Sequence, residues 1–296
     1  MATDKKRHRA GGKIAVIGPG RIGQAMGRLL SQAGAPIAVV AARKLANARR
    51  AVGFIGAGTP RLLRALGPND ATVFLLTTSD SSFAPLAADL ARRGTGPQAW
   101  KGKVVLHTCG SLPSAVLEPL RRCGAAIGSV HPYQTVPSAA VGVQNLRGTF
   151  WAIEGDRAAL QMARDWVKRL DGIAFTIRPE DKTLYHLSAF LVCPTVVTLM
   201  EQAQKLLAEA RVPSRIARPM LRQFVDQTTK NFADMGGRRS LTGPAVRGDW
   251  TTIERHLKAL RQSAPEFLPV YRALLAAMLR LAGKEVPNAR RRAHSS

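Results

Sequence analysis

The chain has 296 residues and a formal net charge of +25 at pH 7, because 44 Lys and Arg stand against 19 Asp and Glu. A hydrophobic content of 46% is typical of a globular protein with one large domain or two smaller ones. Three cysteines without paired spacing argue against a disulfide framework and a zinc cluster, and predict a reducing, cytoplasmic location.

Two basic tails, residues 1–12 and 284–296, each have a net charge of +3, and we expect both to be disordered. The remaining +19 is scattered over predicted helix surfaces without an aromatic-interleaved stripe, so we predict no specific nucleic-acid partner. Nonspecific binding of nucleic acid at low salt stays an open alternative. The most apolar later run, residues 187–200, is shorter than the ~20 residues of a membrane span, which predicts a buried helix and no membrane role.

Short apolar runs alternate with stretches of helical periodicity through the first 178 residues. The predicted strands cover 13–18, 36–42, 71–77, 103–108, 126–130, 149–154 and 173–177, and the predicted helices 21–33, 83–93, 114–122 and 157–170. This alternation predicts an α/β fold, a parallel Rossmann sheet with helices on both faces.

After residue 178 the strand patterns end. Helices are predicted over 182–210, 215–235, 250–262 and 265–282, with a loop between the second and the third. We therefore predict an NADP-binding Rossmann domain over 13–178 and an all-helical substrate and dimerisation domain over 179–283.

The first predicted strand leads directly into GPGRIG, which comprises Gly18, Pro19, Gly20, Arg21, Ile22 and Gly23. Gly18 allows a tight turn, Gly20 lets the backbone approach a pyrophosphate, and Gly23 lets the helix pack closely on the strand. Phosphates would bind the free N–H groups at the helix start. A tight turn without a ligand is the alternative, but the strand before and the helix after favour a dinucleotide site.

The end of the second predicted strand distinguishes NADP from NAD. An NAD site usually places an acid there, whereas this chain has Arg43 and Lys44, with no Asp or Glu between Gly34 and Asp70. The planar Arg43 and the point charge of Lys44 suit the 2′-phosphate of NADP, although a solvent-facing pair is the alternative. We predict NADP as cofactor, with Thr77 and Thr78, at the end of the next predicted strand, near its nicotinamide half.

Reduction of a carbonyl or imine also needs a group that protonates or polarises the acceptor. His186, early in the first long helix, is our first candidate for the acid, although a structural histidine is about equally plausible. His131 follows a strand end and is a second candidate. Arg247 would bind a substrate carboxylate, and Asp249 is expected to cap the next helix. The six histidines form no pattern typical of a metal site, so we predict no metal.

Five stretches resemble a known family: GPGRIG, VVLHTCGSL (104–112), GSVHPYQT (128–135), LYHLSAF (184–190) and LTGPAVRGDWTTIERHLKAL (241–260). The chain resembles bacterial two-domain proteins in which a Rossmann-like domain precedes a C-terminal domain of unknown function 2520. This group is similar in plan to deazaflavin-dependent NADP oxidoreductases, pyrroline-5-carboxylate reductases and ketopantoate reductases. The resemblance implies a helical domain like that of 6-phosphogluconate dehydrogenase, and a homodimer with its site in an interdomain cleft.

One departure concerns Cys193-Pro194, where the family tends to carry Ser-Asn. The proline is expected to kink the long helix, and the missing amide puts catalysis through that position in doubt. Our main hypothesis is an NADP(H)-dependent oxidoreductase that transfers hydride to a small, acidic carbonyl or imine compound. The alternative is a non-catalytic NADP(H)-binding or sensing protein.

Overall fold

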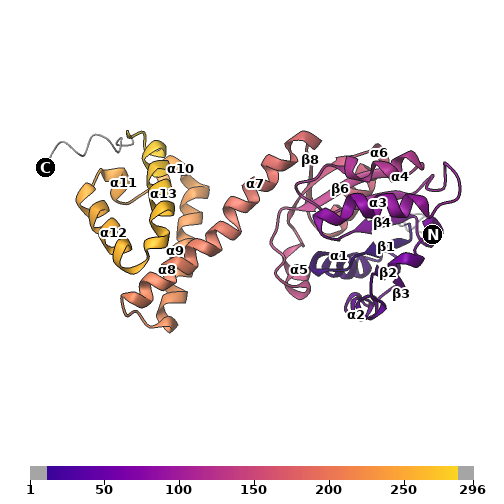
Figure 1. The fold of residues 1–296 in the computed structure, drawn as a ribbon, viewed down its shortest axis with the longest axis horizontal. Helices are drawn as coiled ribbons and strands as arrows, with labels where there is room; N and C mark the ends of the chain where they lie inside the picture. The colour runs from indigo at the N-terminus through magenta and orange to yellow at the C-terminus, as the bar shows by residue number, and fades with distance from the viewer. Residues whose placement is uncertain (1–11, 286–296) are drawn as a thin grey trace, which may run out of the picture. The chain divides into compact units, whose positions relative to one another are not determined.

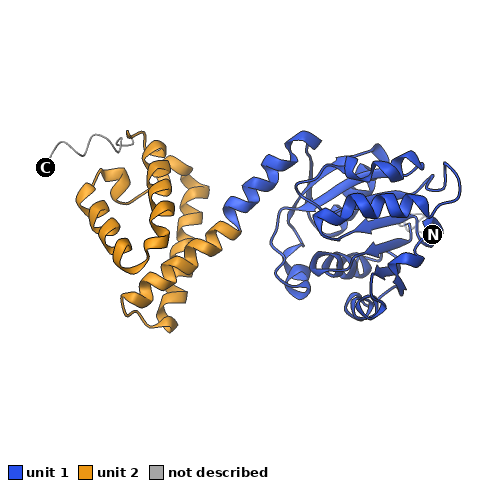
Figure 2. Cartoon of the chain, viewed as in Figure 1, with its two compact units in different colours: residues 1–193 blue, residues 194–296 orange. Residues whose placement is uncertain are grey.

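The computed structural model describes residues 12–285, so residues 1–11 and 286–296 of the two predicted tails lie outside the described residues. Figure 2 shows the division into two compact units, unit 1 (Met1–Cys193) and unit 2 (Pro194–Ser296). The domain boundary expected after residue 178 stays a prediction.

Unit 1 contains one eight-stranded sheet in the order β3-β2-β1-β4-β5-β6-β7-β8 (Figure 1). The strands are β1 (Ile14–Ile17), β2 (Ile37–Ala42), β3 (Thr59–Leu62), β4 (Val73–Leu76), β5 (Val104–His107), β6 (Ala126–Pro132), β7 (Phe150–Gly155) and β8 (Ile173–Thr176). The mostly parallel Rossmann sheet is confirmed. The β6–β7 pair is antiparallel, which corrects the wholly parallel expectation, because an apolar run does not encode strand direction.

Helices cover both faces of this sheet, as predicted. They are α1 (Arg21–Gln32), α2 (Leu45–Ile55), α3 (Phe83–Arg92), α4 (Glu118–Arg122), α5 (Ala139–Asn145) and α6 (Arg157–Arg169). The last helix of unit 1, α7 (Lys182–Val192), is largely exposed and leads away from the sheet (Figure 1). Leu29 of α1 and Trp166 of α6 belong to one buried cluster, and Phe83 of α3 and Leu120 of α4 belong to a second. Because strand side chains alternate between faces, the apolar strands supply side chains to both clusters.

The described residues of unit 2 are helical and contain no strand, which confirms the predicted all-helical second region. The helices are α8 (Pro194–Glu209), α9 (Ser214–Met235), α10 (Gly237–Ser240), α11 (Pro244–Arg247), α12 (Trp250–Ser263) and α13 (Leu268–Leu281). The single helix expected over 182–210 is interrupted, since α7 ends at Val192 and α8 begins at Pro194, which has no N–H to donate. The loop expected before residue 250 contains the short helices α10 and α11.

Most of the apolar helical segment Pro179–Glu209 is exposed in the structure, apart from the buried Lys182 in its first turns. The segment has 31 residues, and its most apolar stretch of 18 residues has a mean hydropathy of 1.5 and contains no buried residue. By length and composition alone, the segment could cross a membrane. Leu191 and Val197 are 59% and 65% exposed, so the expectation of a buried helix over 187–200 is wrong within this chain. Apolar composition shows that a surface avoids water, but it does not show what covers that surface.

Candidate functional site

The glycine turn between β1 and α1 has a steric reason for two of its glycines. Gly18 has a φ of +68°, and a Cβ there would lie 2.3 Å from Thr78 Cγ2. A Cβ on Gly23 would lie 2.1 Å from the Thr77 hydroxyl. Around Gly20 no atom comes closer than 3.9 Å to such a Cβ, so space remains in front of the start of α1. The turn therefore packs tightly on the β4 end and leaves the helix N-terminus approachable.

A cavity of about 610 Å³ lies against this turn, at the carboxyl ends of β1, β2 and β4. Its lining residues are Gly18, Pro19, Gly20, Ala42, Arg43, Asn47, Leu63, Thr77, Thr78, Ser79, Ser82, Pro85, Leu86 and Asp89. Six of the ten predicted cofactor residues are in this set. Arg21, Ile22 and Gly23 instead continue into the first turn of α1, and the exposed Lys44 is the N-cap residue of α2.

The cavity has the chemistry that a dinucleotide needs. Thr78 Oγ1 is buried and has no hydrogen-bond partner among the described residues, so it can bond to a ligand. The exposed Arg43 supplies a cation at the β2 end of the cavity. The carboxylate of Asp89 is already paired with Arg93, the C-cap residue of α3. The uncompensated charge at the β2 end is therefore positive, which suits a phosphate.

Two of the three predicted catalytic residues lie together in unit 1. His131 is near the end of β6 and His186 is in the second turn of α7, and their ring centroids are 6.0 Å apart. We call these two residues the histidine pair. A Cβ on Gly110, in the loop after β5, would lie 2.7 Å from both His131 Nε2 and His186 Cδ2. The third residue, Arg247, is exposed on α11 of unit 2, so the histidine pair is assembled from unit 1 alone.

His131 is held as a neutral imidazole. Burial, reinforced by the positive charge of Lys182 and by His186, lowers the pKa of His131 to about 3. Burial also raises the pKa of the Tyr185 phenol, whose oxygen lies 3.0 Å from His131 Nδ1. When the phenol donates to Nδ1, the imidazole proton is on Nε2, on the side of Gly110 and His186. At neutral pH His131 can donate a hydrogen bond but carries no extra proton.

A buried ion pair lies behind the histidine pair, and the sequence did not predict it. Lys182 and Glu154 are only 1% and 2% exposed, and Lys182 Nζ lies 3.6 Å from Glu154 Oε1. Glu154 also accepts hydrogen bonds from the backbone N–H and the hydroxyl of Ser114, both at 2.7 Å. Burial lowers the pKa of Lys182, and Glu154 opposes that shift. The one indication in the sequence was an acid, Glu154, at the end of an apolar strand.

The loops after β4 and β5 connect the cavity to the histidine pair. Ser111 Oγ donates a weak hydrogen bond of 3.4 Å to Asp80, which follows the cavity residue Ser79. The next residue back, Gly110, touches both histidines. Because β5 lies between β4 and β6, the cavity and His131 are two strand spacings apart, about 10 Å. The cavity, the two loops and the histidine pair therefore follow one another along the carboxyl edge of the sheet.

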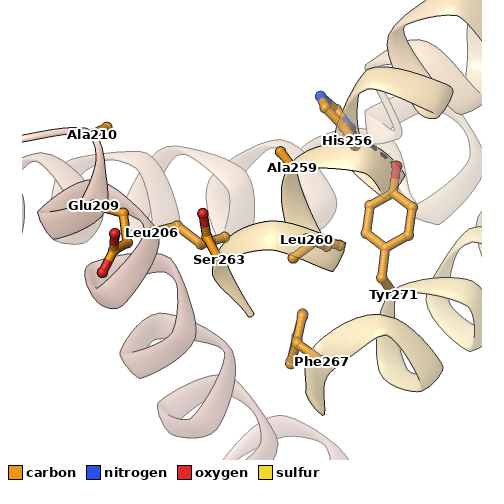
Figure 3. A pocket seen from close by; sticks show the side chains of 9 residues that line it. All are labelled: Leu206, Glu209, Ala210, His256, Ala259, Leu260, Ser263, Phe267 and Tyr271. Carbon is orange, nitrogen blue, oxygen red and sulfur yellow. Dashed lines mark hydrogen bonds between the residues drawn. The ribbon is translucent and has the colours of Figure 1, made fainter. Parts of the chain in front are cut away.

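Unit 2 has a cavity of its own, about 490 Å³, between α8, α12 and the start of α13 (Figure 3). Its walls are mostly apolar, and its main polar feature is the 3.0 Å contact between His256 Nδ1 and the Tyr271 hydroxyl. None of the predicted site residues lines it. Among the described residues there is no group of three or more His, Cys, Asp or Glu that could hold a metal ion.

The chain matches two family models. The Rossmann-like domain model matches residues 2–132, and the model described as Domain of unknown function (DUF2520) matches residues 149–278. No curated protein matches the sequence.

Several solved structures share the fold. A Bacteroides fragilis protein described as a candidate NADP oxidoreductase is 23% identical, with a TM-score of 0.73 over 91% of this chain and 98% of that one. An imine reductase from a Pseudomonas species is 18% identical, with a TM-score of 0.64 over 92% and 98%. The Plasmodium falciparum pyrroline carboxylate reductase, solved with NADP bound, is 11% identical, with a TM-score of 0.57 over 91% and 98%. The chain therefore combines a Rossmann-like domain with a DUF2520 domain that follows it, as the resemblance implies.

Proposed function

We propose that this protein is an NADP(H)-dependent oxidoreductase that reduces a small, acidic carbonyl or imine compound. The observation that carries the proposal is the unit 1 cavity, which has a glycine turn and a helix N-terminus at one side and Arg43 at the other. Bound NADPH would supply a hydride to the electrophilic carbon, while the substrate oxygen or nitrogen gains a proton and NADP⁺ is left.

The cofactor would be held by groups at both ends of this cavity. Backbone N–H groups at the start of α1 would bind the pyrophosphate, because no side chain caps this helix. Arg43, with Lys44 beside it, would bind the 2′-phosphate, and the unpartnered Thr78 hydroxyl would bond to the nicotinamide half. NADP-binding proteins among the structures with this fold support the choice of cofactor.

The histidine pair would act on the substrate. The Nε2–H of His131 would donate a hydrogen bond to the carbonyl oxygen or imine nitrogen, and the exposed His186 would supply the proton. Arg247, on α11 of unit 2, stays a predicted partner for a carboxylate, separately from the histidine pair. The overall positive charge of the chain favours an acidic substrate.

A fluorescence titration of NADPH against NADH tests the proposed cofactor, using wild type, Arg43→Ala and the control Arg49→Ala. Arg49 is exposed on α2 and does not line the cavity. We expect tighter binding of NADPH, and a loss of about 10- to 100-fold in that preference for Arg43→Ala, the value of one charge-assisted hydrogen bond. Equal affinity of the wild type for both cofactors would refute the assignment of Arg43.

A non-catalytic NADP(H)-binding or sensing role is the second candidate, favoured by the helix break at Cys193-Pro194. Consumption of NADPH with a panel of 2-oxo acids and cyclic imines separates the two candidates. An oxidoreductase turns over at least one of these compounds and is slowed by His186→Ala. A sensing protein binds NADPH tightly, consumes none of it, and is unaffected by this substitution.

We also propose that a second copy of the chain covers the exposed apolar helices. Leu187 and Leu191 of α7 are 48% and 59% exposed, and Phe224 and Phe232 of α9 are 75% and 62% exposed. Such surfaces usually mark protein contacts or membranes. We expect a dimer in sedimentation and a monomer for Phe224→Ser/Phe232→Ser. Flotation of the wild type with lipid vesicles would instead support a membrane contact.

A further inference from the structure

The loop after β5 is fixed through the backbone of Cys109, which is bonded on both sides. The Cys109 N–H donates to His107 Nδ1 at 3.1 Å. The Cys109 carbonyl accepts from Lys182 Nζ at 3.1 Å and from Ser129 Oγ at 3.3 Å. The next residue is Gly110, which touches both members of the histidine pair. Lys182 therefore holds the peptide against which the histidine pair lies.

Lys182 is also the first residue of α7, and this fixes the following turn of the helix. Tyr185 and His186 come three and four residues later, so they lie on the same face of α7 as Lys182. Tyr185 contacts His131, and His186 lies beside it. The position of the Lys182 ammonium thus sets where both side chains meet β6.

The Lys182 ammonium is bonded within the protein and shielded from a substrate. A lysine has three N–H donors. Lys182 Nζ has three acceptors around it: Ser129 Oγ at 2.6 Å, the Cys109 carbonyl at 3.1 Å and Glu154 Oε1 at 3.6 Å. The side chain is also 1% exposed. A direct role in proton transfer to substrate is therefore disfavoured by geometry.

Stability alone does not account for this arrangement. Taking two charges out of water is costly, and apolar replacements of a buried ion pair are often as stable. What an ion pair adds is a defined geometry, because its hydrogen bonds are directional. Here the geometry joins four chain segments: the β5 loop, β6, β7 and the first turn of α7.

We propose that Lys182 is a positioning residue, which fixes the Cys109–Gly110 peptide and the first turn of α7 so that Tyr185 and His186 meet His131. Its importance for catalysis rests on the proposed function, whereas its effect on the geometry does not. Glu154 holds the ammonium in place from β7 and is itself held by Ser114.

The test is the double variant Lys182→Met/Glu154→Gln, which removes both charges while the amide introduced at position 154 can still accept a hydrogen bond from Ser114. Lys168→Met, a change at an exposed lysine of α6, is the control. NMR of protein labelled with ¹⁵N-histidine reports the tautomer of His131, and a ring-to-ring cross-peak reports its contact with Tyr185. The NMR signals of His131 are assigned by their absence from the spectrum of His131→Asn.

In wild type and control we expect the Nε2–H tautomer of His131 and a strong cross-peak to Tyr185. In the double variant we expect loss of the cross-peak and appearance of the Nδ1–H tautomer, with NADPH affinity within about twofold of wild type because no cavity residue is changed. Once a substrate is known, kcat should fall by about 10- to 100-fold. If the double variant does not fold, Ser129→Ala, which removes one of the three acceptors, should weaken the same cross-peak.

A folded double variant that keeps the tautomer and the cross-peak would overturn the proposal. This outcome is separate from failure of the proposed function, which the NADPH titration and the substrate panel detect in the wild type. A change in the histidine pair without any turnover in wild type would leave Lys182 as a positioning residue in a binding protein.

Discussion

Substitution of Gly23 by alanine tests the packing of the glycine turn against the β4 end. The added Cβ would lie 2.1 Å from Thr77 Oγ1 and 3.0 Å from Thr77 Cβ. Thr77 cannot easily turn away, because it is 5% exposed and its hydroxyl donates to the carbonyls of Ile17 and Gly18 at 3.1 and 2.9 Å. Overpacking costs about 1–3 kcal/mol, and a lost hydrogen bond costs about 1 kcal/mol more.

Gly53 is the matched control, because it is an exposed glycine inside α2 with no atom within 4 Å of an added Cβ. Gly53→Ala should raise the free energy of unfolding by up to about 1 kcal/mol, because alanine has a higher helix propensity than glycine. Gly23→Ala should gain less from this effect, because Gly23 lies in the first turn of α1. Urea unfolding should therefore separate the two variants by about 2–5 kcal/mol. Gly23→Ala should also weaken NADPH binding, since Thr77 lines the cavity. Equal stability of the two variants would refute the packing argument.

Three further predictions concern pH, helix capping and salt. Burial lowers the pKa of His107 to about 3, so below pH 6.5 the unfolded state binds a proton that the folded state does not. As the pH falls from about 6 to 4, His107 should therefore lower the free energy of unfolding by about 1.4 kcal/mol per pH unit. His107→Asn should remove this contribution to the slope in urea titrations. Asp249 accepts from the Thr252 N–H at 3.0 Å at the start of α12, as predicted for a cap, so Asp249→Ala should lower the thermal midpoint and Asp249→Asn should restore most of it. If binding of a random DNA duplex is only electrostatic, it should weaken at least about tenfold between about 50 and 200 mM salt. Affinity that persists at high salt would contradict our expectation of no specific nucleic-acid partner.

The fold was largely predictable because buried parallel strands have an apolar pattern that needs no knowledge of their partners. All seven predicted strands are present. The missed strand, β3, has the sequence TPRL at the edge of the sheet, where a proline is tolerated and an apolar pattern is not required. The exposed face of α7 and α8 was mispredicted for a different reason, because sequence gives the polarity of a surface and not the chain that covers it.

The candidate site divides in the same way between local and long-range features. The glycine turn and Arg43 were predictable because they follow strands directly in the sequence. The contact between His131 and Tyr185 joins residues 54 positions apart, and that between Ser129 and Lys182 joins residues 53 positions apart. Nothing in either local sequence specifies such a pairing. These contacts depend on the strand order and on where α7 begins, which only the structure supplies.

The source of the proton in the proposed reaction follows from the state of each group near Gly110. Lys182 is buried, donates two hydrogen bonds and is ion-paired with Glu154, and the Tyr185 hydroxyl is hydrogen-bonded to His131 Nδ1. With a pKa of about 3, His131 carries an extra proton in only about one molecule in 10,000 at pH 7. His186 is exposed beside His131, so its ring can meet a substrate directly. We therefore expect His186→Ala to abolish most of kcat, and His131→Asn to lower kcat while leaving any inflection of its pH profile in place. An inflection that disappears in His131→Asn instead would show that His131 is the acid and that its neutral assignment is wrong.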